Sequence, residues 1–433
     1  MSEPVIHQDA GDVVLDASFK GIPYGTRTRL ADIASRGWNV AAGDLALPVM
    51  TLDQAAVESN IAAMAAYCTR NGVRLAPHGK TTMSPQLFRR QLAAGAWAIT
   101  AATPGQACLM REAGIQRILL ANELVDPNAL RWLAAEYRRD PAFELIFLVD
   151  HPAAVALADE VLTAAGPGRK VPVLVELGLD GPAGRTGVRT AAAAIALAEQ
   201  VAATATLALA GVETYEGVVA RGASPAEIEA VDQFLTGVAG VARTMHERGL
   251  AGGGEFVLSA GGSIYFDRVI AAFAPLRTQI PGLQIVLRSG GYLSHDAGRH
   301  RQLSPLDGRR DSGEELRLTD ALTLWGSVLS VPEPGRVIVG IGKRDAPYDV
   351  ELPMPQRLYR AGQGGTPASL ASARVVKLMD QHALVDVDPQ LPVTPGDIMA
   401  LGVSHPCAAF DRWRFLPLID AGGTVVDGVI TSF

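Results

Sequence analysis

The central part of the chain alternates between short apolar runs and longer stretches with the periodicity of amphipathic helices. Short apolar runs that alternate with helices are typical of buried parallel strands in α/β proteins. The pattern therefore predicts strand and helix in turn from residue 73 to residue 289. The predicted strands are 74–77, 97–100, 117–121, 145–149, 171–177, 208–214, 256–259 and 284–287.

Helix boundaries in this region carry the residues that helix ends prefer. Ser84-Pro85 supplies an N-cap followed by proline at the first helical position, and Thr103-Pro104-Gly105-Gln106 adds a capping box. Gly95 and Gly114 stand where helices should end. Eight strand–helix units over about 215 residues match a parallel (β/α)8 TIM-type barrel, for which roughly 250 residues is typical. A doubly wound sheet is the alternative.

The pattern changes after Tyr292. Residues 299–315 are charged and rich in turn formers, and strand composition returns at 328–331, 337–340 and 383–387. Residues 345–366 are dense in proline and glycine, which predicts a long loop. These features predict a second, mainly β domain.

The first 45 residues contain no strand–helix unit. We expect this segment to pack on the β domain or to cover the barrel mouth. A chain of 433 residues exceeds what one hydrophobic core usually organises, so several domains are expected. The predicted organisation is an N-terminal segment (1–45), a barrel (46–300) and a mainly β C-terminal domain (301–433).

Composition narrows the class of protein. With 48% hydrophobic residues and a net charge of −7, the chain can bury a sizeable core and gives no reason to expect nucleic acid or a membrane as partner. Three cysteines are too few and too scattered for a disulfide framework, which favours a reducing compartment such as the cytoplasm. The N-terminus has no apolar signal core, and the Ala-rich stretch at 191–212 is interrupted by Glu199 and Gln200, so no transmembrane segment is expected.

Unusual polar residues follow several of the predicted strands. In a (β/α)8 barrel these positions meet at one mouth, where active sites lie. Lys80 follows the first strand, Arg185 the fifth and Tyr215 the sixth. Glycine-rich turns follow the seventh strand, at Gly261-Gly262-Ser263, and the eighth, at Gly290-Gly291-Tyr292.

Turns after the seventh and eighth strands commonly bind phosphate in such barrels, because backbone amides and a helix N-terminus favour an anion. A lysine beside a phosphate site fits pyridoxal 5'-phosphate, whose aldehyde bonds covalently to a lysine. The sequence therefore predicts a pyridoxal-phosphate site with Lys80 as the attachment point.

Each of these residues also has a purely structural explanation. A lysine after a strand is most often a solvated surface residue, the glycine-rich turn can simply precede a helix, and Arg185 and Tyr215 can serve an ion pair and core packing. His78 is close to Lys80 in sequence, but a structural role in the loop is favoured over acid–base chemistry. Cys68 and Cys108 are expected to be buried, small apolar groups on helices.

His405-Pro406-Cys407 places an imidazole and a thiol two residues apart in an apolar segment. A histidine beside a buried thiol explains this pair as readily as a metal site does, because a strong zinc signature needs more ligands. If the pair binds a metal, imidazole and thiolate favour zinc and leave coordination positions open for substrate and water.

Several ordered motifs resemble those of a known family. They are Pro77-His78-Gly79-Lys80-Thr81, Gln91-Leu92-Ala93-Ala94-Gly95-Ala96, Leu120-Ala121-Asn122-Glu123, Gly184-Arg185-Thr186-Gly187-Val188, Thr214-Tyr215-Glu216-Gly217, Ser259-Ala260-Gly261-Gly262-Ser263 and Ser404-His405-Pro406-Cys407. From residue 47 to the end, the chain resembles the fold-type III pyridoxal-phosphate enzymes related to alanine racemase, in the branch of D-serine dehydratase and D-threonine aldolase.

The resemblance implies a role for each candidate residue. Lys80 would bind the cofactor covalently, Arg185 would bond its phenolic oxygen and Tyr215 would face its pyridine nitrogen. Gly262, Ser263 and Tyr292 would hold the phosphate, and His405 and Cys407 would be the metal ligands. Cysteine at the last position resembles the dehydratase, whereas the aldolase branch is expected to have His-x-Asp.

Three functions are compatible with these features. The first is a metal-assisted dehydratase that converts D-serine, D-threonine or another D-3-hydroxy amino acid to a 2-oxo acid and ammonia. The second is a retro-aldol lyase of the D-threonine aldolase type, and the third is a non-catalytic pyridoxal-phosphate carrier. Elimination must expel hydroxide, which needs a Lewis acid such as a divalent cation. Relatives of fold type III also imply a homodimer.

Overall fold

The computed structural model describes residues 10–251, 254–309, 315–360 and 366–433 and divides the chain into two compact units. The unit that we call the β unit comprises Met1–Met64, Thr81–Arg90 and Gly291–Phe433. The other, which we call the barrel unit, comprises Ala65–Lys80 and Gln91–Gly290. Each unit is therefore assembled from separate segments of the chain.

The barrel unit contains one sheet of eight parallel strands in the order β4-β11-β10-β9-β8-β7-β6-β5. A parallel bridge between His78 and Thr100, with the Trp97 N–H donating to the Leu75 carbonyl at 2.7 Å, joins β4 to β5 and closes the barrel. This closure confirms the predicted (β/α)8 fold and excludes the doubly wound sheet. The strands are β4 (Arg74–Leu75), β5 (Ile99–Ala101), β6 (Arg117–Glu123), β7 (Glu144–Val149), β8 (Val171–Glu176), β9 (Leu207–Glu213), β10 (Phe256–Ala260) and β11 (Leu283–Leu287).

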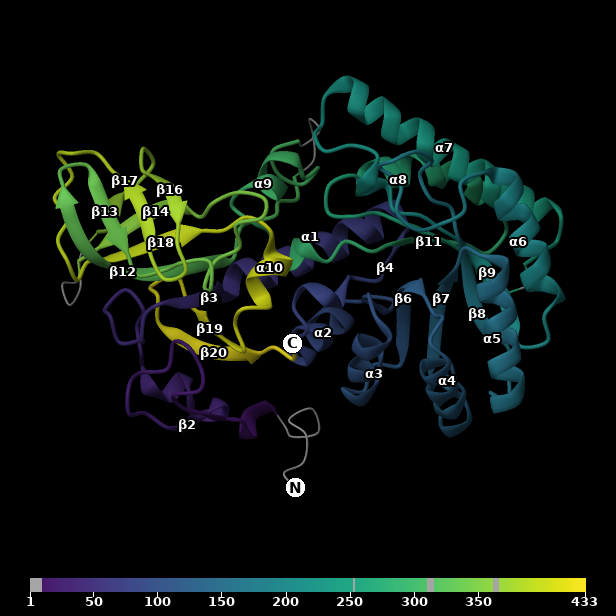
Figure 1. Cartoon of the computed structure of the whole chain (residues 1–433), viewed down its shortest axis with the longest axis horizontal. Coiled ribbons are helices and arrows are strands. Elements are labelled where there is room, and N and C mark those ends of the chain that lie inside the picture. Colours follow the sequence, from purple (N-terminus) through teal and green to yellow (C-terminus); the bar gives the residue numbers. More distant parts are fainter. Residues whose placement is uncertain (1–9, 252–253, 310–314, 361–365) are drawn as a thin grey trace. The chain divides into compact units, whose positions relative to one another are not determined.

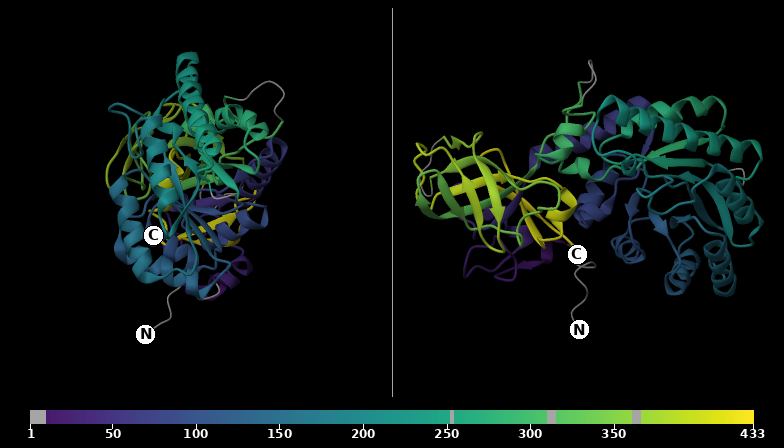
Figure 2. Two further views of the ribbon diagram at one scale, coloured as in Figure 1. Left: turned by 90° about the vertical axis from the view of Figure 1, so that its right-hand side faces the viewer. Right: turned by 45° about the horizontal axis from the view of Figure 1, so that its top comes forward.

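Helices surround the outer face of this sheet (Figures 1 and 2). Side chains from the strands fill the interior; they include Ala76, Leu119, Ile146, Leu148, Leu174, Val257 and Val286, all buried. The surrounding helices within the barrel unit are α3 (Pro104–Glu112), α4 (Pro127–Arg139), α5 (Pro152–Ala165), α6 (Ala191–Ala203), α7 (Pro225–Glu247) and α8 (Phe266–Phe273); α1 (Gln54–Asn71) and α2 (Pro85–Ala93) contribute to both units.

The predicted helix boundaries agree with the structure, but the predicted Ser84 cap is wrong: α2 begins at Pro85, and Ser84 Oγ is buried without a hydrogen-bond partner among the described residues. Thr103 caps α3 by accepting a hydrogen bond from the Gln106 N–H at 3.2 Å. The Gln106 side chain accepts from the Ala102 N–H instead of the Thr103 N–H, so the capping box is modified at its second bond. Gly95 and Gly114 have φ values of 93° and 88°, the left-handed conformation that ends helices.

The β unit contains antiparallel strands from both ends of the chain. Its strands are β3 (Val49–Asp53), β12 (Leu322–Glu333), β13 (Arg336–Val339), β14 (Met354–Tyr359), β15 (Ala368–Ser369), β16 (Arg374–Leu378), β17 (Ala383–Asp386), β18 (Ile398–Gly402), β19 (Phe415–Ile419) and β20 (Val425–Ile430). β3 pairs with β12 antiparallel and with β19 parallel, so a strand near residue 50 completes a sheet built from residues after 320.

The prediction of a continuous loop over residues 345–366 is wrong at β14. This strand pairs with β18, and Pro355 stands at a register shift, where a residue without an N–H is tolerated. The prolines made this strand look like a loop in the sequence. Only its pairing with β18 shows that the backbone N–H that Pro355 lacks is not needed for the sheet. Residues 361–365 of the predicted loop and residues 310–314 of the charged segment lie outside the described residues.

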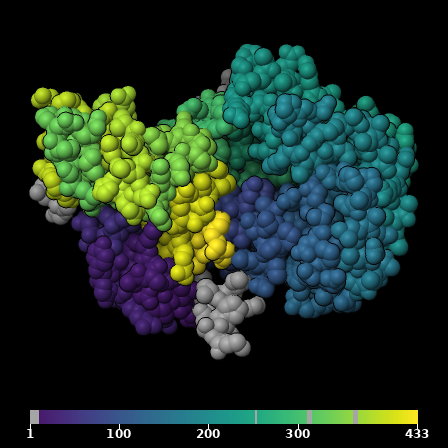
Figure 3. Space-filling view, in the orientation of Figure 1, coloured from purple at the N-terminus to yellow at the C-terminus, as the bar shows by residue number. Residues whose placement is uncertain are grey.

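The N-terminal segment packs on strands of the β unit. Leu15, Phe19, Ile22 and other apolar residues before residue 46 share one hydrophobic cluster with β18, β19 and β20. Figure 3 shows this purple segment against the yellow C-terminal strands. The elements of this segment are short: β1 (Val14–Leu15), β2 (Thr28–Arg29) and three 3-10 helices (Ala10–Asp12, Leu30–Asp32 and Ala34–Arg36).

Two short helices, α9 (Arg299–Leu303) and α10 (Pro406–Phe410), complete the β unit. Across the described part of the chain, none of the helices combines the length and apolar character that a membrane crossing requires.

Candidate active site

Lys80 lies directly beyond β4, in a 3-10 turn that spans Gly79–Thr81, and its side chain is partly buried. The loop is fixed to the neighbouring strand, because the His78 N–H donates to the Arg288 carbonyl at 3.2 Å. A Cβ atom on Gly290 would lie 2.5 Å from the His78 carbonyl oxygen, so only glycine fits there. Backbone packing between the ends of β4 and β11 thus holds the loop that carries Lys80.

The His78 ring lies in a positive environment. Burial lowers the pKa of His78 well below its usual value, and the charges of Lys80, Arg288 and Arg185 act in the same direction. His78 is therefore neutral at physiological pH. The influence of three cationic side chains on one ring also shows that Lys80 and Arg185, predicted from separate loops, converge at the same end of the barrel.

Arg185 and Tyr215 are brought together as predicted for one site. The Arg185 guanidinium carbon lies 5.2 Å from the Tyr215 ring centroid, a cation–π contact. The Tyr215 ring also packs over glycines: a Cβ atom would lie 2.5 Å from it at Gly217 and 3.0 Å at Gly262. The loops after β8, β9 and β10 therefore meet around this ring.

The turn after β10 has a partner that the sequence analysis missed. The N–H groups of Gly261 and Gly262 donate to the two carboxylate oxygens of Glu216, at 2.9 and 2.7 Å. Glu216 is fully buried. These two amides, predicted to hold a phosphate, are therefore engaged by a side chain, and phosphate binding at this turn depends on Ser263 and the residues after it. Glu216 belongs to the Thr214-Tyr215-Glu216-Gly217 motif, which is the signal that could have found it.

Gly291 and Tyr292, the other predicted phosphate ligands, are buried residues of the β unit. They begin a 3-10 turn, Gly291–Leu293, directly after the barrel unit ends. Their role toward the cofactor stays a prediction.

Carboxylates gather at the carboxyl ends of β6, β7 and β8. Ligand oxygens of Glu123, Asp150 and Glu176 all lie within 4.8 Å of one another. Burial, together with a hydrogen bond and charge repulsion from Glu176, raises the pKa of Glu123 to about 9. Three carboxylates this close can bind a cation or share a proton, and the raised pKa favours a proton shared between Glu123 and Glu176. Each of these residues ends an apolar run, a signal that the sequence analysis did not use.

A buried contact between an arginine and a glutamate joins the ends of β9 and β11. Arg288 contacts Glu213, and both side chains are almost fully buried. Burial raises the pKa of Glu213 to about 8, although Arg288 acts in the opposite direction. The Arg288 guanidinium also donates to the Thr214 carbonyl at 2.7 Å, which ties the end of β11 to the loop that carries Tyr215.

His405 and Cys407 lie together at the start of α10 in the β unit. A hydrogen bond to Cys407, opposed by burial and reinforced by Asp349, raises the pKa of His405 to about 9. Nδ1 of His405 lies 2.5 Å from an Asp349 oxygen, and Cys407 Sγ lies 3.2 Å from Thr81 Oγ1. Asp349 thus contacts His405, but among the described residues no third histidine, cysteine or carboxylate has a ligand atom within 4.8 Å of both members of the pair.

The expectation that the other two cysteines are buried is confirmed for Cys68 and wrong for Cys108. Cys68 on α1 is buried, and burial raises its pKa to about 12. Cys108 on α3 is only half-buried, and burial and Glu112 raise its pKa as well.

The residues present fit both implied groups. Lys80 supplies the amine that pyridoxal phosphate requires, and the glycines at 217 and 262 let the Tyr215 ring lie close to the backbone of two neighbouring loops. His405 and Cys407 form a nitrogen–sulfur donor pair of the kind that zinc favours. Asp349 on the second ring nitrogen matches the carboxylate–histidine arrangement found behind metal ligands.

Two parts of the chain match known protein families. Residues 52–258 match the family "Alanine racemase, N-terminal domain", and residues 321–419 match the family "Putative serine dehydratase domain". The chain belongs to the fold-type III pyridoxal-phosphate enzymes.

Individual relatives within this family are lyases. The chain is 29% identical to a D-threonine aldolase from Arthrobacter sp over 88% of its own length and 90% of the relative's. Its structure is similar to a D-threonine aldolase from Filomicrobium marinum (TM-score 0.74, 24% identity, 91% and 97% of the two chains). It is also similar to a D-threo-3-hydroxyaspartate dehydratase from Delftia sp. HT23 (TM-score 0.71, 22% identity, 91% and 99%). The chain is a pyridoxal-phosphate-dependent lyase, which excludes the non-catalytic carrier.

Proposed function

We propose that the protein is a metal-dependent dehydratase of D-3-hydroxy amino acids such as D-serine or D-threonine, giving a 2-oxo acid and ammonia. The observation that carries the proposal is the thiol of Cys407, which hydrogen-bonds the His405 ring and contacts Thr81. A thiolate in place of a carboxylate favours zinc, a strong Lewis acid toward a hydroxyl leaving group.

Pyridoxal phosphate supplies an electron sink for the α-carbon, and a divalent cation, which we propose to be zinc, supplies Lewis acidity. Within this chemistry Lys80 serves as the attachment point and, once released, its amine removes the α-proton. Arg185 and Tyr215, in contact with each other, would orient the ring of the cofactor. Ser263, Gly291 and Tyr292 are the proposed phosphate ligands.

The metal ligands are proposed to be His405 and Cys407. Two protein ligands leave coordination positions for the substrate oxygen and water. His405 must give up its proton to bind a cation, and the Cys407 thiol must do the same, so metal binding releases protons.

Identifying the reaction products distinguishes elimination from retro-aldol cleavage. Incubation with D-threonine should give 2-oxobutanoate and ammonia, whereas glycine and acetaldehyde would establish the aldolase. The identity to the Arthrobacter D-threonine aldolase favours this second candidate. Exhaustive chelation and His405→Ala should each abolish turnover, and activity that survives both would remove the metal from the proposal.

Lys80→Ala tests the cofactor site separately. The wild-type chain should be yellow after dialysis, and Lys80→Ala should be colourless after the same dialysis. Lys170→Ala is a matched control, because Lys170 is an exposed lysine that donates to the Thr204 carbonyl at 2.8 Å.

We also propose a symmetric homodimer, since relatives of this fold type imply one. Sedimentation of the holoenzyme at working concentration should give twice the mass of the 45.4 kDa chain. A monomer mass would contradict the proposal.

A further inference from the structure

The backbone of His405 has a conformation that histidine rarely adopts. Its φ and ψ angles are 71° and 78°, on the left-handed side of conformational space. A residue with a Cβ atom is disfavoured there by about 1 to 3 kcal/mol and persists only where its surroundings enforce it. Something in the β unit must therefore hold His405 in place.

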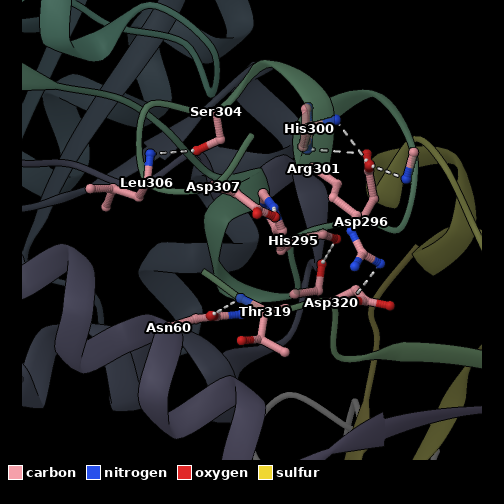
Figure 4. Close-up of polar contacts among 12 residues, drawn as sticks. Asn60, His295, Asp296, His300, Arg301, Ser304, Leu306, Asp307, Thr319 and Asp320 are labelled. Carbon is pink, nitrogen blue, oxygen red and sulfur yellow. Dashed lines mark hydrogen bonds and ion pairs between the residues drawn. The ribbon is translucent and has the colours of Figure 1, made fainter. Parts of the chain in front are cut away.

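Asp296 supplies that restraint. One carboxylate oxygen accepts hydrogen bonds from the N–H groups of Gly298 and His300, both at 2.9 Å. The other oxygen accepts from the N–H of His405 at 3.2 Å and lies 3.2 Å from His300 Nδ1. Figure 4 shows Asp296 beside His300, and only 1% of Asp296 is exposed.

The turn that carries Asp296 packs closely against the residue before His405. A Cβ atom on Gly298 would lie 2.7 Å from the Ser404 side chain, and the Arg299 N–H donates to Ser404 Oγ at 3.4 Å. The turn over residues 296–300 and the segment 404–405 therefore form one hydrogen-bonded unit. A carboxylate buried this deeply is stable only when its oxygens are satisfied, so movement of His405 would leave Asp296 without one of its donors.

A second carboxylate acts on the His405 side chain. Asp349 lies 2.5 Å from Nδ1, so it holds the ring by that nitrogen and leaves Nε2 as the nitrogen that can bind a cation. Asp296 fixes the main chain and Asp349 fixes the ring, so the two carboxylates act on different parts of the same residue.

We infer that Asp296 and Asp349 are positioning residues that pre-organise His405 as a metal ligand. The inference rests on the proposed function, because it needs His405 to bind a cation. Neither carboxylate need contact the metal. Their contribution is to remove the conformational freedom that an unrestrained His405 would lose on binding.

The test measures the Zn²⁺ dissociation constant of the full-length holoenzyme by competition with a chromogenic chelator. Asp296→Asn and Asp349→Ala should each weaken binding about 10- to 100-fold, the usual effect of outer-shell partners. Asp349→Asn keeps an oxygen that can accept from Nδ1, so it should recover most of the lost affinity. The cofactor's visible absorption should stay unchanged in all three variants.

Asp307→Asn is the matched control for Asp296→Asn. Asp307 pairs with His295 at 2.9 Å in the same segment (Figure 4), so its substitution leaves the contacts of Asp296 with His405 in place. It should therefore retain wild-type zinc affinity. Equal losses in Asp296→Asn and Asp307→Asn would indicate general damage and overturn the role of Asp296.

Two further outcomes separate the inference from the proposed function. If His405→Ala loses zinc while Asp296→Asn and Asp349→Ala bind as wild type, the inference fails and the metal site stands. If the wild-type chain binds no zinc and no other divalent cation, both fail. Should Asp296→Asn not fold, Asp349→Ala and Asp349→Asn carry the test, because Asp349 is half-exposed and its removal leaves the buried turn intact.

Discussion

Thr81 Oγ1 lies 3.2 Å from Cys407 Sγ, although the two residues are separated by 326 positions in the sequence. Thr81 directly follows Lys80, the predicted cofactor lysine. The thiol proposed to bind a metal is thus in contact with the residue adjacent to the proposed attachment point of pyridoxal phosphate.

Removing this hydroxyl should weaken the metal site. Thr81→Val keeps the shape of the side chain but removes its hydrogen bond to sulfur, worth about 0.5 to 1.5 kcal/mol, which corresponds to about a 2- to 12-fold loss of affinity. Chelator competition would measure the zinc dissociation constant, and Thr81→Ser should restore it. Wild-type affinity in Thr81→Val would show that the contact does not support the thiolate.

Exchange of the thiol for a carboxylate should change metal preference. Cys407→Asp offers a harder ligand, so zinc affinity should fall by at least about 10-fold while Mn²⁺ affinity holds or rises. Measuring both dissociation constants in one preparation gives the ratio directly. Cys108→Ser is the control, since Cys108 lies on α3 in the barrel unit and should affect neither constant.

Glu216 should control cofactor affinity through the turn that it holds. Glu216→Gln leaves one of the Gly261 and Gly262 amides facing an NH2 group, and an unsatisfied buried donor costs about 1 to 3 kcal/mol. The pyridoxal-phosphate dissociation constant, followed by visible absorption, should rise about 10-fold or more. Glu227→Gln makes the same change at an exposed carboxylate that accepts from the Gly222 and Ser224 amides, and it should bind cofactor normally.

The Glu123–Glu176 pair predicts an unusual pH dependence of stability. The pKa of Glu123 is about 9 in the folded chain and about 4.5 when unfolded, so between these values the folded state retains a proton that the unfolded state has released. Unfolding free energy should therefore fall as pH rises from 4.5 to 9, by at most about 1.4 kcal/mol per pH unit for one proton.

Glu123→Gln isolates this effect, because its amide cannot ionise. Relative to wild type, the variant should gain stability steadily as pH rises through that window, as measured by urea denaturation at several pH values. Parallel pH profiles for the two proteins would mean that Glu123 and Glu176 do not share a proton.

The barrel follows from local sequence features. All eight strands were predicted from apolar runs, because a buried parallel strand has a continuous hydrophobic signature. Helix ends could be predicted equally well, since Thr103 and Gly114 act through hydrogen bonds to nearby backbone groups. Lys80, Arg185 and Tyr215 could be assigned to one site because each follows a strand of the same barrel.

The strand pairing of the β unit could not be predicted in the same way, because it joins segments that are distant in the sequence. β3 joins β12 and β19 across more than 250 residues, and β14 contains a proline that alone suggests a loop. Antiparallel strands with one exposed face carry a weaker signal, and their partners are chosen by side-chain packing. No local pattern could assign residue 50 to a sheet built mainly after residue 320.

The sequence by itself determined the fold class and was enough to predict Lys80 as the cofactor lysine and His405 and Cys407 as candidate metal ligands, because those predictions depend on residue type and local position. Only the tertiary structure decided what surrounds them: Glu216 on the glycine turn, Glu123 beside Glu176, and Asp296 and Asp349 on His405. A buried carboxylate acts through the donors that folding brings to it, and those donors come from segments far apart in the chain.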